Sequence, residues 1–219
     1  MDKRMKLRVL CLWTLVLASL QPLSAQSGTE LLAGLRNRLL GGKAWEIELH
    51  ILAQRDNKIE FFNDEATLTL QGECYRLEGD YFTFYADSAA VWLLDPTAGE
   101  ITVSERVDSY DNFLENPLAI LQEEALDLFA VSEPVVRTYQ GERVQVVLLT
   151  SHSVQGEEPW VVEVALGPQA DRLRYLNCVR ERESYQIQIL GLRERAKVAA
   201  TYFSPAPAQL EEMEVVDLR

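Results

Sequence analysis

The chain has 219 residues, 47% of them hydrophobic, with 34 acidic against 21 basic residues and a formal net charge of −13 at pH 7. This excess of negative charge disfavours association with the phosphates of nucleic acids and with anionic membrane surfaces. The composition therefore indicates an acidic globular protein and argues against nucleic acid as a partner.

Residues 1–25 have the pattern of a cleaved secretory signal peptide. Four basic residues precede the apolar run Val9–Leu20, which is too short to span a bilayer, and small residues lead to Ala25. Cleavage there would leave 17 basic and 33 acidic residues, a net charge of −16, in a single domain over residues 26–219. Cys11 lies early in the apolar run instead of at its end, so we expect no lipid anchor and a soluble, exported protein.

Two segments have the apolar periodicity of amphipathic helices. The first is expected over Glu30–Leu40, with Thr29 as its cap and Gly41-Gly42 after its end. The second is expected to begin at Asn116-Pro117, an N-cap residue followed by proline, and to end near Val131–Ser132. The residues expected to face the rest of the protein from these helices are Leu31, Leu35, Leu39, Leu118, Leu121, Leu128 and Phe129.

Nearly all the remaining chain has the period-two pattern of β-strands. Trp45–Ile51 and Ala66–Leu70 alternate cleanly, and similar short runs continue to Val198–Phe203. They predict about ten or eleven strands in an antiparallel sandwich or barrel. A surface loop over Ser204–Glu212 and a last short strand at Glu214–Leu218 are expected to follow. The two helices could cover the opening of such a curved sheet.

One predicted strand pair departs from simple alternation. Glu100–Ser104 has apolar side chains on one face only, whereas Val91–Leu94 is apolar on both faces. We expect Trp92 and Leu94 to share the concave face with the apolar residues of Glu100–Ser104. Val91 and Leu93 would then need a cover on the convex side.

Few side chains have the spacing of a catalytic or metal site. His50 and His152 stand apart, with no second ligand at metal-binding distance in the sequence and no Gly-x-Ser-x-Gly motif. The adjacent acidic pairs Glu123-Glu124, Glu157-Glu158 and Glu211-Glu212 would not converge on one bond as glycosidase carboxylates do. We therefore expect no enzyme activity, no metal and no cofactor.

Cysteines and tryptophans leave alternatives open. Cys74 and Cys178 form either a disulfide, which export permits, or two free thiols. Trp45, Trp92 and Trp160 all lie on predicted strands, where they either fill an ordinary core or line a hydrophobic cavity.

The order of several motifs resembles the outer-membrane lipoprotein carrier family, the LolA-like proteins. The chain has Asp87–Pro96 followed by Glu100–Val103, then Asn116-Pro117-Leu118, then Tyr202–Pro205 and finally Glu214–Arg219. The closing Val-Val-Asp-Leu-Arg is similar to the ending of the branch found in Bacteroidetes-type bacteria. The resemblance implies a strongly curved, incomplete antiparallel β-barrel whose mouth is covered by helices.

The resemblance also implies a function. LolA-like carriers accept acylated lipoproteins from an inner-membrane ABC-type release complex, shield the acyl chains and deliver the cargo to an outer-membrane acceptor. A soluble periplasmic carrier, acting as a monomer, is therefore the leading hypothesis. An acyl chain of about fifteen carbons costs on the order of 12 kcal/mol to expose to water, because each methylene costs ~0.8 kcal/mol.

Under this hypothesis, apolar strand residues would line a cavity for the acyl chains. They are Trp45, Ile47, Leu49, Leu68, Leu70, Phe82, Phe84, Trp92, Leu94, Ile101 and Val103.

The chain also departs from the family pattern at two places. Gln71-Gly72-Glu73 stands where better-known members have a basic residue followed by proline, and Asp87-Ser88-Ala89 replaces an Asp-Gly-Lys turn. A lid latch that uses that basic residue is therefore not expected here.

Two other hypotheses remain. The same hollow sheet could bind a different lipid or a hydrophobic small molecule in the periplasm. An exported hydrolase is the third hypothesis, and it predicts a polar cleft with convergent carboxylates of perturbed pKa.

Overall fold

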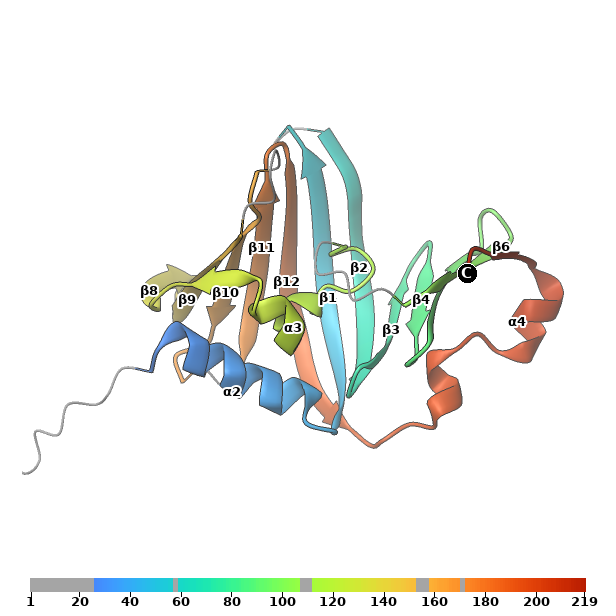
Figure 1. Ribbon diagram of the computed structural model, residues 1–219, viewed down its shortest axis with the longest axis horizontal. Helices are drawn as coiled ribbons and strands as arrows, with labels where there is room; N and C mark the ends of the chain where they lie inside the picture. The colour runs from blue at the N-terminus through green and yellow to red at the C-terminus, as the bar shows by residue number, and fades with distance from the viewer. Residues whose placement is uncertain (1–25, 57–58, 107–111, 153–157, 170–171) are drawn as a thin grey trace, which may run out of the picture.

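The computed structural model describes residues 26–56, 59–106, 112–152, 158–169 and 172–219, so the predicted signal peptide lies outside the described residues. One strongly curved sheet forms the body of the molecule, and helices cross one of its faces (Figure 1). The sheet does not close into a barrel: β7 and β8 are the edge strands at one end, and β13 is the edge strand at the other. The predicted fold class, a mainly β, curved and incomplete barrel with a helical cover, is confirmed.

Within the described residues, the sheet has 13 strands, in the order β13-β6-β5-β4-β3-β2-β1-β12-β11-β10-β9-β7, and β8 also pairs with β9. Their bounds are β1 Ala44–Arg55, β2 Ile59–Gln71, β3 Cys74–Gly79, β4 Thr83–Ala86, β5 Ala90–Asp95, β6 Glu100–Glu105, β7 Phe129–Val131, β8 Val135–Tyr139, β9 Glu142–Ser151, β10 Val161–Leu166, β11 Leu173–Arg180, β12 Glu183–Arg195 and β13 Glu214–Asp217. All pairs are antiparallel except β13 with β6, which is parallel. The antiparallel neighbours follow from short turns, as at Gly72, whose φ of 60° suits the tight turn between β2 and β3.

Helix α2, Gly28–Leu40, confirms the first predicted helix and begins two residues earlier. Its cap is Ser27 instead of Thr29. The Ser27 hydroxyl accepts from the Glu30 amide at 3.2 Å, and the Glu30 carboxylate accepts from the Ser27 amide at 3.0 Å. A Cβ at Gly28 would lie 2.0 Å from the Ser132 carbonyl oxygen, so glycine lets the start of α2 approach the sheet closely.

The second predicted helix is wrong over most of its length. Asn116 does cap a turn, since its side-chain oxygen accepts from the Leu118 amide at 3.1 Å. The helical residues are only the 3₁₀ turn η1, Ala119–Leu121, and the short helix α3, Glu123–Leu126. The chain then leaves the helix because β7 pairs with β9, which gives the β9 edge a backbone partner.

The C-terminal segment also differs from the prediction. The expected strand over Val198–Phe203 is instead the 3₁₀ turn η2, Ala200–Phe203, and the expected loop contains helix α4, Pro207–Glu212. The predicted last strand is confirmed as β13. Figure 1 shows this segment leaving β12 and running beyond β4 to reach β6 at the far end of the sheet.

Candidate ligand-binding surface

The concave face of the sheet carries a continuous apolar layer, which we call the inner surface. On the central strands β1 and β2, apolar residues pair directly across the strands: Trp45 pairs with Leu70 and Ile47 pairs with Leu68. Alternate residues of neighbouring strands continue this layer in both directions, and all belong to one buried cluster. The main members are Trp45, Ile47, Leu49, Ile51, Leu68, Leu70, Tyr75, Leu77, Phe82, Phe84, Val91, Leu93, Val162, Val164, Leu176 and Ile187.

Helix α2 and the segment 113–121 lie on the inner surface, and we call them together the cover. Figure 1 shows α2 crossing the strands near one end, with the α3 region beside it in front of β1 and β12. Leu32 and Leu39 of α2 and Phe113 and Ile120 of the segment are completely buried. The inner surface is therefore filled by the protein's own side chains in this structure.

The predicted cavity-lining residues divide between the two faces of the sheet. Those on the inner surface are Trp45, Ile47, Leu49, Leu68, Leu70, Phe82 and Phe84. The prediction that Trp92, Leu94, Ile101 and Val103 share the concave face is wrong. These four belong to a separate cluster with Tyr85, Ala90 and Met213, which we call the outer cluster.

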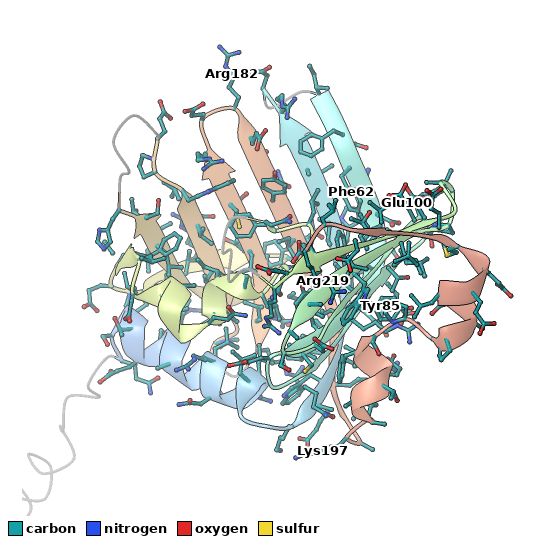
Figure 2. All side chains as sticks on the ribbon, turned by 45° about the vertical axis from the view of Figure 1, so that its right-hand side comes forward. Phe62, Tyr85, Glu100, Arg182, Lys197 and Arg219 are labelled. Carbon is teal, nitrogen blue, oxygen red and sulfur yellow. The ribbon has the colours of Figure 1, made fainter. Side chains whose placement is uncertain are left out.

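The physical reason is the register of β4 and β5. Phe84 pairs with Leu93 and Tyr85 pairs with Trp92, so Leu93 shares a face with Phe84 and Trp92 shares the opposite face with Tyr85. Val91 and Leu93 therefore pack on the inner surface. Trp92 and Leu94 are covered instead by the C-terminal segment, through Met213, and Figure 2 shows Tyr85 on the side where that segment runs.

The predicted lid residues mostly lie where a cover requires them. Leu31, Leu35 and Leu39 are buried on α2, and Leu118 and Leu121 are buried in or beside η1. Phe129 is buried, but on strand β7 instead of a helix. Leu128 is 43% exposed, so the prediction that it faces the sheet is wrong, because the helix ends before it.

Polar contacts also tie the cover to the sheet. The indole Nε1 of Trp45 donates to the carbonyl oxygen of Arg38, in the last turn of α2, at 3.0 Å. The Tyr75 hydroxyl on β3 donates to Glu115 Oε1 at 3.0 Å, and Asn112 Nδ2 donates to Glu115 Oε2 at 2.9 Å. The cover is thus held mainly by apolar burial, with a polar tie near each part.

Burial controls the acid–base behaviour of the second tie. It raises the pKa of the Glu115 carboxyl, although the hydrogen bonds from Tyr75 and Asn112 and the charge of Arg106 act in the opposite direction. Burial also raises the pKa of the Tyr75 hydroxyl, and the neighbouring Glu115 charge adds to this shift. Sequence reasoning missed both residues, because Tyr75 and Glu115 are 40 residues apart and only the fold brings them together.

The side chains considered for catalysis do not assemble within the described part of the chain. His50 lies on the outer face and contacts Asn63 at 2.8 Å. The described residues contain no group of three His, Cys, Asp or Glu that could hold a metal ion, and Glu157 lies outside them. Cys74 and Cys178 are both free, and burial raises the pKa of the Cys178 thiol.

Surface pockets also occur away from the inner surface. One of about 630 Å³ lies between the outer face and the C-terminal segment, where Arg76 stacks between the rings of Tyr85 and Tyr202. Another of about 360 Å³ lies at the tip of the β11–β12 hairpin, beside Arg55 and Arg180. Among the described residues, no helix is both long enough and apolar enough to cross a bilayer.

The arrangement defines a class of fold: an open, curved sheet whose apolar concave face is closed by a helical cover. A conserved protein from Thermus thermophilus has a similar solved structure, with a TM-score of 0.54 at 14% identity over 88% of this chain and 99% of that one. This likeness shows a shared fold.

Two further solved structures have lower scores. A LolA superfamily protein from Nitrosomonas europaea has a TM-score of 0.45 at 8% identity, over 83% of this chain and 99% of that one. The lipoprotein LppX from Mycobacterium tuberculosis has a TM-score of 0.44 at 12% identity, over 79% and 100%. No protein-family model and no curated protein sequence matches the chain.

Proposed function

We propose that this protein is a soluble, exported carrier that shields the acyl chains of lipoproteins and moves them through the periplasm to the outer membrane. The observation that carries the proposal is the continuous inner surface closed by an amphipathic cover. The proposal assigns no catalytic step and uses no metal or cofactor. The motif order that resembles the LolA-like carriers supports the same function.

The cover supplies a mechanism for both uptake and release. Four leucines of α2, Leu31, Leu32, Leu35 and Leu39, are at most 3% exposed. Full burial of one leucine stabilises by about 1.5–3 kcal/mol, so the helix gains on the order of 6–12 kcal/mol from its contact with the inner surface. One acyl chain gains a comparable amount, about 12 kcal/mol, when it replaces the helix. Binding and release are then close to balanced, as a carrier requires.

The proposed partners follow from this exchange. Acylated lipoproteins are the cargo, an inner-membrane ABC-type release complex supplies them, and an outer-membrane acceptor receives them. A net charge of −16 after signal cleavage would keep the carrier off anionic membrane surfaces between these encounters. The carrier acts as a monomer, since the inner surface is closed within one chain.

Recovery of the protein from the periplasm, followed by intact mass spectrometry of what it holds, tests the proposal. Acylated lipoproteins are expected. Phospholipid or fatty acid without protein would instead establish the alternative, a carrier for another lipid. An empty protein that also fails to solubilise lipoproteins from spheroplasts would overturn both.

A matched pair of leucine variants localises the site. Leu121, a residue of the cover, is 1% exposed because it packs in the buried cluster of the inner surface, whereas Leu190 is 53% exposed. Leu121→Asp should abolish cargo retention, because a carboxylate then faces the acyl chains, and Leu190→Asp should retain cargo within about two-fold of wild type. Circular dichroism of both variants checks that they fold. Equal loss in the two folded variants would contradict the placement of the site.

A further inference from the structure

The inner surface contains a buried indole N–H that has no acceptor in the described part of the chain. Trp160 is 3% exposed, and its Nε1 has no hydrogen-bond partner among the described residues. Trp45 on the same surface does have one, the Arg38 carbonyl oxygen at 3.0 Å. Buried indole N–H groups normally find an acceptor, and an unpaired donor in a low-dielectric interior destabilises the folded state. The N–H of Trp160 therefore calls for a functional explanation.

The surroundings of Trp160 place it where the cover meets the sheet. The ring of Phe113, a residue of the cover, stands edge-on to Trp160 with 5.0 Å between ring centroids. The ring centroid of Tyr185, on β12, lies 5.9 Å from that of Trp160 and 5.5 Å from that of Phe113. Displacement of Phe113 together with the cover would thus open space beside the indole for an incoming ligand.

A row of aromatic rings joins this position to solvent. Tyr185 is followed by Phe61, with 6.2 Å between centroids, and Phe61 is 45% exposed. A guanidinium lies over each end of the row, Arg180 at 4.6 Å from the Trp160 ring and Arg55 at 5.7 Å from the Phe61 ring. Arg180 and Arg55 both border the cavity at the hairpin tip, which Figure 2 marks with Arg182 at the end of the sheet remote from α2.

This row has the polarity profile of an acylated molecule at the point where the chain joins its head group. Apolar rings suit the first methylenes. The guanidinium groups suit polar head-group atoms that accept hydrogen bonds, and Arg55 also pairs with Glu183 at 2.9 Å. Between the methylenes and the head group lies the ester, whose carbonyl oxygen is a hydrogen-bond acceptor with no hydrogen to donate. Trp160 Nε1–H, which has no partner among the described residues, is a donor with no acceptor function.

We propose that Trp160 Nε1–H is the hydrogen-bond donor for the ester carbonyl of an acyl-ester ligand, while its chain lies on the inner surface in place of Phe113 and α2. This specificity contact rests on the proposed acyl-chain function. It selects acyl esters over ethers and alkanes of the same length, which bury equal apolar area and accept no such bond at that position.

The test compares two fluorescent glycerolipid probes with the same head group and chain length, one a diester and the other a diether. The purified mature protein is expected to bind the diester about 2- to 10-fold more tightly, the range of one added hydrogen bond. Trp160→Phe should bind both probes equally, with its diether affinity near that of wild type. Trp92→Phe is the matched control on the outer face, and it should keep the wild-type preference.

The outcomes separate the two proposals. If wild type binds neither probe, the acyl-carrier function fails. If wild type binds both probes equally, or if Trp160→Phe keeps the diester preference, the role of Trp160 is overturned while the carrier function stands. Nuclear magnetic resonance of the wild-type protein gives a second measurement that does not depend on the stability of a variant. The resonance of the Trp160 indole proton should shift downfield when the diester binds and should not do so when the diether binds.

Discussion

The two faces of the sheet are both apolar and both covered, but the two covers are held in different ways. On the inner surface, α2 contributes leucines that are at most 3% exposed, and the side-chain hydrogen bond from Trp45 to the Arg38 carbonyl oxygen ties its last turn to the sheet. On the outer cluster, the C-terminal segment contributes the partly buried Met213 and then pairs with β6 as strand β13. The backbone contacts include Glu214 N to Gly99 O at 3.0 Å and Leu218 N to Val103 O at 2.8 Å.

Under the proposed function, this difference separates a cover that an acyl chain replaces from one that it does not. Burial of leucine is non-directional, so an acyl chain offers the inner surface the same stabilisation. Backbone N–H and C=O groups of β6 need directional partners, which hydrocarbon lacks. We therefore expect ligands to exchange with α2 and the C-terminal segment to stay in place.

Truncation of one side chain on each cover should give the largest contrast. Leu35→Ala removes a side chain that is 1% exposed and should lower the free energy of unfolding by about 2–5 kcal/mol. Met213→Ala, in a partly buried position, should cost less than about half as much. Urea titrations measure both. A larger loss for Met213→Ala would reverse the proposed importance of the two covers.

Removal of residues 214–219 tests the directional cover. The deletion leaves the β6 edge unpaired, which should promote self-association. Because each lost hydrogen bond costs about 0.5–1.5 kcal/mol, the free energy of unfolding should fall by on the order of 2–3 kcal/mol. Affinity for an acyl probe should stay within about two-fold, as measured by probe fluorescence on monomeric fractions. Leu218→Ser, at a 66% exposed position, is the control and should change stability by less than about 0.5 kcal/mol. A lost probe signal would mean that the C-terminal segment contributes to the ligand site.

Two glycines of α2 sharpen the contrast within the inner cover itself. Gly28→Ala puts a Cβ against the Ser132 carbonyl oxygen, so the helix must shift, at about 1–3 kcal/mol. Gly34 has open space around its Cβ position, so Gly34→Ala should stabilise the helix by about 0.5–1 kcal/mol. Hydrogen exchange of α2 amides should become faster in the first variant and slower in the second. Equal exchange rates would show that the close approach at Gly28 does not hold the helix.

The Tyr75–Glu115 tie should produce the smallest effect, a pH dependence. The raised pKa means that the folded state favours protonated Glu115, so this contribution to stability is complete below the ordinary value of 4.5 and is lost as pH rises through the higher folded-state value. Glu115→Gln cannot ionise, so the stability of wild type relative to this variant should fall as pH rises from 4 upward. Urea unfolding across that range measures the difference. A flat difference would mean that Glu115 is effectively solvated.

Sequence reasoning succeeded where a local pattern decides the structure. The leucine spacing from Leu31 to Leu39 determines a helix with one apolar face, and the alternation on β1 and β2 determines which residues share a face. These two patterns identified α2 and the centre of the inner surface. They did not identify β7, because Leu128 and Phe129 continue the helical spacing of Leu121 and Ala125, and only pairing with β9 draws Phe129 into a strand.

The sequence by itself determined that the chain forms a curved β-structure with a leucine-rich helix to cover it. The tertiary structure decided which face of β5 is inside. Val91–Leu94 is apolar on both faces, and such a strand has two equally favourable orientations until its register is set by pairing with β4. The tertiary structure also decided which distant residues are in contact, such as Tyr75 with Glu115 and Trp160 with Phe113, because local periodicity carries no information about which segments meet.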